Sequence, residues 1–426
     1  MQRRVQERAG DVVQAPADGY PTGEPSARRT IPLRVGVLAV LVSLGLHAVT
    51  VAVWPAYYNV YIDTEVYQAA GRALLAGRDL YSEPLVEPGI HSLYHVYTPF
   101  AAALFTPLVL VPLPLLDYLG LALNLVLLTV VVRVSMTATG SRVPVALPLL
   151  VASLAFWLEP VRTTAWLGQI NLLLMLLVLL DLPRGPSRWP PGLGIGLASG
   201  IKLTPLLFIP YLVLTGRRRE AAVASVTALG TVGVGYLVAP QASVTYWSGV
   251  VLESTRIAEP TMISNQSLRG MLARIGDGSV PGGLGVWFVL AGVLAVAGLT
   301  VAVRLWRAGD HVLGTALCGL TTSIVSPFSW GHHWVWFVPL LAVLCLEVYR
   351  TGDRRSAAGA AALLLAAGSV LYGIRSDGTP AMGMFLIEGA GPFGLLTHNI
   401  YCWIYLAILA YAVTLVRNRS RSTVAG

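Results

Sequence analysis

The chain has 426 residues, of which 55% are hydrophobic and only 12% are charged, and its mean hydropathy is +0.68. Soluble domains carry about 25% charged residues, so this composition excludes a soluble globular protein and predicts an all-α polytopic membrane protein. The net charge of +8 does not indicate a nucleic-acid partner, because the basic residues stand in short clusters beside apolar spans, which is the pattern of topology signals.

The N-terminal region predicts a tail, a membrane span and an interfacial helix. Residues 1–30 are polar and arginine-rich, and no small-residue cleavage site follows the first apolar span, residues 31–54. They predict a disordered cytoplasmic tail rather than a cleaved signal. Asp63 lies nine residues after this span, and the run behind it predicts an amphipathic helix that ends at Gly77, with one face made by Val66, Ala69, Ala70, Ala73 and Leu74. Such a helix is expected to lie along the membrane interface.

The distribution of arginine and lysine predicts the orientation of the later spans. Basic clusters collect on the cytoplasmic side, and placing all of them there leaves five outer segments: 55–115, 160–166, 241–283, 327–333 and 374–396. On this scheme both termini are cytoplasmic. Residues 31–417 form one transmembrane domain, and residues 418–426 form a second cytoplasmic tail.

Two segments interrupt the regular spans. Residues 190–214 have basic clusters at both ends but are too short for two full crossings of a core about 30 Å thick. They predict two short helices that meet at residues 200–205. Residues 98–115 contain four prolines and are expected to dip into the membrane without spanning it. Irregular backbone at membrane depth needs protein or a water-filled cavity around it, so both breaks indicate a cavity. Counting the short pair as two gives about twelve spans.

Asp63 is the first candidate for chemistry. A carboxylate just outside the first membrane helix, on the side opposite the arginine-rich tail, is where a membrane-embedded transferase would keep a general base. An alternative is helix capping, because Asp63-Thr64-Glu65 is an ordinary helix start. Asp63 and Glu65 provide only two ligands for a hard cation, which takes about six oxygens, so no metal site is predicted from this pair.

The densest polar and aromatic cluster is the run from Ser326 to Trp336, which contains His332 and His333. An aromatic interface belt explains its tryptophans but not two adjacent histidines. Neighbouring residues on a helix point about 100° apart and rarely share one ion, and the three cysteines lie in apolar stretches without a CxxC motif. We therefore predict no metal or cofactor. A histidine that donates to a phosphate or a sugar fits better.

Lys202 is a lone lysine in an apolar segment, at the junction of the two short helices. Such a charge costs a few kcal/mol unless it reaches water or an anion. Two half-helices that meet there favour an anion pocket, and snorkelling of the side chain to the interface is the alternative.

Several further polar residues fall at the predicted outer ends of spans. Glu159 and Arg162 can form a pair, whereas Gln169 and Asn171 suit recognition of hydroxyl groups. Asn265 and Gln266 form the corresponding set in the loop 241–283. Arginine bonds two phosphate oxygens at once through its planar fork, and the candidates for charge neutralisation in that loop are Arg256, Arg269 and Arg274.

The sequence contains no Walker A loop and no GxGxxG motif after a strand, so no nucleotide pocket is predicted. The predicted polar loops face away from the cytoplasm, where nucleotide sugars are made. A transferase at this side needs a donor that has already crossed the membrane, and a lipid-linked sugar phosphate meets that need.

These motifs together resemble glycosyltransferase family 87, the polyprenyl-phosphate-mannose-dependent α-1,2-mannosyltransferases of the GT-C superfamily in mycobacteria and their relatives. The resemblance covers about residues 55–345 and rests on the order and spacing of the following motifs: Asp63 with Val66-Tyr67, Ala73-Leu74-Leu75-Ala76-Gly77, Leu80-Tyr81, Tyr97-Thr98-Pro99-Phe100, Glu159-Pro160-Val161-Arg162-Thr163-Thr164, Gly168-Gln169-Ile170-Asn171, Gly200-Ile201-Lys202-Leu203-Thr204-Pro205, Asn265-Gln266-Ser267 and Ser326-Pro327-Phe328-Ser329-Trp330-Gly331-His332-His333-Trp334.

The resemblance implies a GT-C fold in the plasma membrane with an extracytoplasmic active site. It implies that Asp63 is the catalytic base and that His332 and His333 lie at the donor phosphate or the reacting sugar. The implied donor is polyprenyl-phosphate mannose, and the implied acceptor is a mannosylated glycolipid: a phosphatidylinositol mannoside, lipomannan or lipoarabinomannan. Transfer of arabinose or another sugar from a polyprenyl phosphate is an alternative within this class.

The expected mechanism is a single displacement with inversion. Asp63 takes the proton of an acceptor hydroxyl as that hydroxyl attacks the anomeric carbon, and the departing phosphate is neutralised by Lys202, Arg269 and His332 or His333. A transporter of lipids or solutes is the alternative from another class. It fits the many spans and Lys202, but it does not explain the large polar outer loops, and the internal repeats common in transporters are not visible.

Overall fold

A computed structural model describes residues 31–53, 62–86, 93–182, 189–253, 256–376, 378–389 and 391–424. The predicted tail of residues 1–30 lies outside these residues. Within them the chain is almost entirely helical, as predicted, apart from one hairpin of β1 (Tyr372–Ile374) and β2 (Pro380–Met382). The sequence does not predict this hairpin, whose turn includes Gly378 at a φ of +81°.

Six helical segments are long and apolar enough to cross a membrane, so the chain is a multi-pass membrane protein. The segments are α1 (Leu33–Val53), α5 (Leu113–Thr137), α11 (Arg218–Val238), α14 (Leu284–Arg307), η5 with α16 (Gly331–Thr351) and the first part of α19 (Ile400–Val424). A seventh is possible, because α7 (Glu159–Leu167) and α8 (Asn171–Leu180) form one apolar pair bent by 115°. These counts refer to the described part of the chain.

The predicted count of about twelve spans is not confirmed. Several predicted crossings are short apolar helices: α6 (Ala146–Ala155), η2 with α10 (Thr204–Leu214) and α15 (His311–Val325). Another short apolar segment, α4 with η1 (Pro99–Leu110), lies in the stretch predicted to dip into the membrane without spanning it. A helix rises 1.5 Å per residue, so ten residues extend only about 15 Å and cannot cross the hydrocarbon core alone. Length, more than apolar character, separates these helices from the six longer ones.

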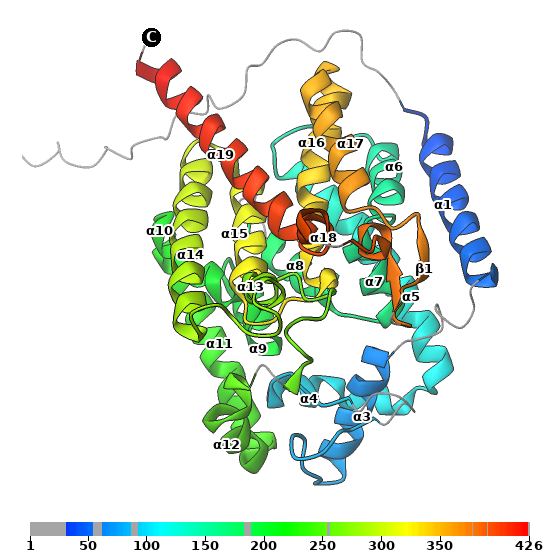
Figure 1. The fold of residues 1–426 in the computed structure, drawn as a ribbon, viewed down its shortest axis with the longest axis vertical. Coiled ribbons are helices and arrows are strands. Elements are labelled where there is room, and N and C mark those ends of the chain that lie inside the picture. Colours follow the sequence, from blue (N-terminus) through cyan, green and yellow to red (C-terminus); the bar gives the residue numbers. More distant parts are fainter. Residues whose placement is uncertain are drawn as a thin grey trace, which may run out of the picture.

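The arrangement of the helices is visible in Figure 1. Helix α1 stands at one edge of the bundle and packs on α6 through Gly36, where a Cβ would lie 2.8 Å from the Ala146 carbonyl oxygen. Helices α3 (Ile62–Leu75), α4 (Pro99–Phe105) and α12 (Pro240–Ser248) gather at one end of the molecule. Helix α3 matches the predicted amphipathic helix, since it buries Val66, Ala70 and Ala73 and ends before Gly77.

The remaining elements join and cap the bundle. They are η1 (Thr106–Leu110), η3 (Val250–Leu252), α13 (Leu268–Ile275), η5 (Gly331–Trp336), α16 (Phe337–Thr351), α17 (Arg354–Ala366), η6 (Gly383–Leu386) and α18 (Gly391–Thr397). Helix α19 continues to Val424, so residues 418–424 of the predicted C-terminal tail are helical.

The predicted pair of short helices is confirmed. Helix α9 (Leu193–Ile201) ends next to Lys202, and η2 (Thr204–Leu207) begins two residues later and leads into α10 (Phe208–Leu214). Helix α9 lies close against α11, because Gly196 and Gly200 present no side chains there: a Cβ would come within 2.5 Å of Thr227 and 2.2 Å of Thr231. Small residues at membrane-helix contacts permit such close approach. Because Lys202 directly follows α9, this contact also sets the position of Lys202.

Candidate active site

Asp63 lies in the first turn of α3 and is partly exposed, whereas its neighbour Thr64 is buried. The turn after α7 positions it. Gly168 ends that helix with a φ of +71°, and a Cβ there would lie 1.8 Å from the Thr64 hydroxyl oxygen. Only glycine permits both this left-handed backbone and this contact. The start of α3 therefore rests on the α7–α8 turn, and Asp63 comes beside Gln169.

The side chain of Gln169 hydrogen-bonds to the Asp63 carboxylate. Burial raises the pKa of Asp63 to about 6, and the Gln169 hydrogen bond and the positive charge of Lys202 oppose that rise. Asp63 is therefore ionised at neutral pH and can accept a proton.

Lys202 is the only lysine among the 426 residues. Its Nζ lies 3.2 Å from Asn171 Oδ1 and 2.9 Å from His333 Nε2, and 5.4 Å from the centroid of the Tyr97 ring. An ammonium group can only donate hydrogen bonds, so His333 accepts through Nε2 and carries its proton on Nδ1. Lys202 is partly exposed. Its two hydrogen-bond partners are neutral, and its positive charge acts on the Asp63 carboxylate.

The two histidines lie on η5 and differ in exposure. His333 faces Lys202 and is partly exposed, whereas His332 is 4% exposed and its ring stacks 6.1 Å from that of Trp330. The two imidazole planes are nearly perpendicular, at 82°. No cluster of three or more metal-ligating side chains occurs among the described residues. Of the two, His333 is therefore the one that shares a site with Lys202.

Hydrogen bonds from the neighbouring helices hold the backbone of this histidine pair. Asn171 Nδ2 donates to the His332 carbonyl oxygen at 3.0 Å, and Ser323 Oγ donates to the His333 carbonyl oxygen at 3.2 Å. Asn171 therefore contacts both Lys202 and the histidine segment. It serves as a link between them, in addition to any contact with a hydroxyl group.

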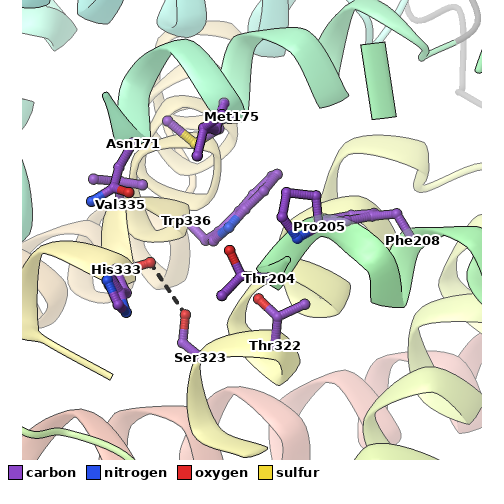
Figure 2. A pocket seen from close by; sticks show the side chains of 11 residues that line it. Asn171, Met175, Thr204, Pro205, Phe208, Thr322, Ser323, His333, Val335 and Trp336 are labelled. Atoms are coloured by element: carbon purple, nitrogen blue, oxygen red, sulfur yellow. Dashed lines mark hydrogen bonds between the residues drawn. The ribbon is translucent and has the colours of Figure 1, made fainter. Parts of the chain in front are cut away.

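A small cavity of about 30 Å³ adjoins His333 and is drawn in Figure 2. Its polar lining includes Asn171, Thr204, Thr322 and Ser323, and Trp336 closes one side. One water molecule needs about 10–15 Å³ of such space, so the cavity admits small polar species but not a hexose. Nδ1 of His333 has no hydrogen-bond partner among the described residues, which leaves a proton donor in this region.

Glu159 and Arg162 lie on α7, inside the protein. Glu159 is 6% exposed, and its carboxylate accepts hydrogen bonds from Tyr401 at 2.6 Å and Thr163 at 2.7 Å. A Cβ on Gly331 would approach this carboxylate to 2.7 Å, so Glu159 packs closely against the start of η5. Arg162 is fully buried, donates to the Ser369 carbonyl oxygen at 2.6 Å and lies 4.6 Å from the centroid of the Trp157 ring.

Asn265 and Gln266 are fully buried, and their amides bind mainly backbone atoms. Asn265 Oδ1 accepts from Ser329 N at 3.1 Å and from Ser267 Oγ at 2.9 Å. Gln266 Nε2 donates to the carbonyl oxygens of Ile263 at 2.7 Å and His398 at 2.8 Å. These contacts hold the segment before η5, so the structure does not bring the two amides together with Asp63.

The arginines of the late loop have separate surroundings. Arg269 on α13 has its guanidinium 5.9 Å from the centroid of the Trp287 ring. Arg274 donates to Asn399 Oδ1 at 2.6 Å and to the Met262 carbonyl oxygen at 2.7 Å. Arg256 bonds the Tyr81 carbonyl oxygen and lies 3.4 Å from Glu253. Arg256 and Arg274 thus join the loop 241–283 to other segments, Arg256 to the segment after α3 and Arg274 to the residue before α19.

Sequence reasoning missed Tyr67 and Tyr97 as functional residues. Both hydroxyls lie 3.0 Å from Gln169 Oε1 and 2.9 Å from each other. Both tyrosines occur in the motifs that carry the family resemblance. Tyrosines near membrane interfaces are common, so their position alone does not single them out.

A carboxylate, an ammonium group and an imidazole gathered in a multi-pass helical protein fit a membrane-embedded group transferase. Residues 94–327 match glycosyltransferase family 87. The chain belongs to this family.

Several curated relatives cover most of the chain. A Mycolicibacterium smegmatis protein is 38% identical over 69% of this chain and 71% of its own length, and a Mycobacterium tuberculosis protein is 35% identical over 73% and 75%. Both are named polyprenol-phosphate-mannose-dependent α-(1-2)-phosphatidylinositol mannoside mannosyltransferase. Another Mycobacterium tuberculosis protein, 35% identical over 76% of this chain and 75% of its own, is named for phosphatidylinositol pentamannoside. No solved structure gives a significant match.

Proposed function

We propose that this chain transfers mannose from polyprenyl-phosphate mannose to a phosphatidylinositol mannoside or a related mannosylated glycolipid, forming an α-1,2 linkage. The observation that carries the proposal is the pairing of a partly exposed Asp63 with the charge of Lys202. Family membership and the names of the curated relatives support the same donor and acceptor classes.

The reaction is a single displacement at the anomeric carbon. The acceptor 2-hydroxyl oxygen forms the new bond to that carbon while its proton passes to Asp63. The bond from the anomeric carbon to the phosphate oxygen breaks, and its electron pair leaves with the phosphate. A general base contributes about 10²–10⁴-fold. Inversion at a good leaving group needs no second carboxylate, and no cofactor is part of the proposal.

The departing phosphate requires positive charge and hydrogen-bond donors. Lys202 is the principal cation, and the Nδ1 proton of His333 is a second donor. Fixed donors that face developing negative charge stabilise a transition state by about 3–4 kcal/mol each. Arg269 and His332 remain candidates for neutralising the departing polyprenyl phosphate. Gln169 lies beside Asp63 and Asn171 lies beside Lys202. Glu159, Arg162, Asn265 and Gln266 support the fold around them.

The proposal extends to architecture and orientation. We place residues 31–417 in one GT-C catalytic domain of about twelve spans, in the plasma membrane, with cytoplasmic tails at 1–30 and 418–426 and the site facing outwards. Interfacial helices such as α3 would then lie in the outer loops. An impermeant thiol reagent should label a cysteine introduced at exposed Ser82 in intact cells, and labelling only after permeabilisation would refute this orientation.

The experiment that tests the function is Asp63→Asn, assayed with labelled polyprenyl-phosphate mannose and defined mannoside acceptors. The amide keeps the size of the side chain but cannot take a proton, so the rate should fall about 10²–10⁴-fold while the donor still binds. Glu65→Gln, two residues along the same helix, is the matched control and should stay within about threefold of wild type. More than about a hundredth of the wild-type rate in Asp63→Asn would refute the general base.

The same assay distinguishes a transferase from a transporter. A transferase yields a new glycolipid that contains the labelled sugar, whereas a transporter only moves the labelled donor across the membrane. Replacing the mannosyl donor with another polyprenyl-phosphate sugar tests the alternative within the class, because an arabinosyltransferase would use the arabinose donor in preference.

A further inference from the structure

The network behind Asp63 is made of three buried polar side chains. Tyr67, Tyr97 and Gln169 are 2%, 4% and 4% exposed, and their oxygens form a triangle with sides of 2.9, 3.0 and 3.0 Å. They come from three segments: α3, the loop before α4 and the turn between α7 and α8. The opposite end of the Gln169 amide faces Asp63.

Counting protons fixes the orientation of this amide. Each tyrosine hydroxyl carries one proton, and burial raises the pKa of both hydroxyls, so they remain neutral donors. With two protons in the triangle, at least one goes to Gln169 Oε1, which leaves Nε2 directed at Asp63. If the amide turned over, two acceptors would face each other at Asp63, and one of the two tyrosine protons would lose its acceptor.

We propose that Tyr67 and Tyr97 are positioning residues that act through Gln169: their hydroxyls hold its amide in the one orientation that donates to the ionised Asp63. This inference rests on the proposed role of Asp63 as the base. It assigns Gln169 to the base itself, rather than to recognition of a sugar hydroxyl. A carboxylate that accepts a fixed hydrogen bond keeps its negative charge at lower pH, so the network sets the lower limit of the working pH range.

Other charged and titratable groups near Asp63 also contribute. Lys202 acts on it directly, and His333 stands behind Lys202. Glu65 on α3 and Asp117 on α5 act on each other. None of these groups changes when a tyrosine hydroxyl is removed. Phenylalanine also keeps the ring contacts, which are 4.4 Å from Tyr67 to Phe105 and 5.4 Å from Lys202 to Tyr97.

The test compares pH–rate profiles of mannosyl transfer for the wild type, Tyr67→Phe, Tyr97→Phe and the double variant. Each single variant should move the acid limb of kcat/KM upward by a few tenths of a pH unit, and the double variant should move it by about one unit. At low pH this gives about a tenfold loss, while the rate on the alkaline plateau stays within about threefold. Tyr405→Phe is the matched control, since it removes a buried hydroxyl that contacts Thr321 at 3.1 Å, and its profile should not move.

Two outcomes overturn the inference. A lower plateau with an unmoved acid limb means that the hydroxyls only stabilise the fold. An unchanged profile in the double variant means that the amide stays oriented without them. Asp63→Asn separates these results from a failure of the proposed function. If Asp63→Asn is active, the assignment of Asp63 as the base is refuted. If Asp63→Asn is inactive and the acid limbs of the tyrosine variants do not move, only the role of the tyrosines is refuted.

Discussion

Two polar regions of this molecule differ in their surroundings. Asp63, Lys202 and His333 are partly exposed. Lys202 carries a charge opposite to that of Asp63 and hydrogen-bonds to His333. Asn265 and Gln266 are fully buried, and their amides bind backbone atoms and the Ser267 hydroxyl. An amide whose hydrogen bonds are all made within the fold stabilises the structure, whereas a partly exposed charged group can also interact with a substrate. The variants below are chosen to test that distinction.

Among the variants that compare these two regions, Lys202→Met is expected to have the largest effect. Lys202→Met keeps the length and apolar stem of the side chain but removes the charge that faces the departing phosphate. We expect kcat/KM for the mannosyl phospholipid to fall about 10²–10³-fold, with the melting temperature in detergent almost unchanged. Lys202→Arg is the matched control, which keeps the charge in a different shape and should lose less. If the kinetics of Lys202→Met were normal, Lys202 would belong to the support rather than to the site.

The second effect is expected on stability instead of rate. Asn265→Ala removes the oxygen that accepts from Ser329 N and from Ser267 Oγ, and buried donors without acceptors cost about 1–3 kcal/mol each. We expect the free energy of unfolding to fall by about 2–4 kcal/mol, measured as a lower melting temperature. The activity per folded molecule should stay within about threefold of wild type. A stable variant with a raised KM for the acceptor would instead move Asn265 into the site.

The smallest effect is the pH dependence of the wild-type enzyme. Asp63 has its pKa raised to about 6, and a general base must be ionised. The rate constant kcat/KM should therefore be level above this pH and fall about tenfold per unit below it. The sign is opposite for an acid catalyst, whose activity would fall as the pH rises. A profile without an acid limb near pH 6 would contradict the assignment of the base.

The free energy of unfolding also depends on the ionisation of Asp63, but it falls with rising pH where the rate increases. The folded-state pKa of Asp63 lies above the ordinary value of 3.8, so ionisation of this carboxyl disfavours the fold. The resulting loss of stability is absent at low pH, develops as the pH rises from about 4 to 6, and is complete above that range. The proposed base would thus be held at some cost to the folded state, which is common at functional sites.

The sequence predicts the helical multi-pass class, the first span, α3 and the helix pair around Lys202, because these depend on local apolar patterns and prolines. The predicted span count is not confirmed, since an apolar run such as Ala146–Ala155 has the composition of a span without its length. Asp63, Lys202 and the histidines stand out as polar groups at membrane boundaries. The roles of Tyr67 and Tyr97 depend on contacts with Gln169, 102 and 72 positions away, which spacing along one chain does not reveal.

The single lysine also allows the proposed site to be modified selectively. Because Lys202 is the only lysine in the 426 residues, an amine-reactive ester can acylate only this side chain, apart from the α-amino group. The stoichiometry of modification then reports how many active sites in a preparation are open. A polyprenyl phosphate bound against the ammonium group should slow acylation in proportion to occupancy, so that covalent modification becomes a titration of the donor without turnover.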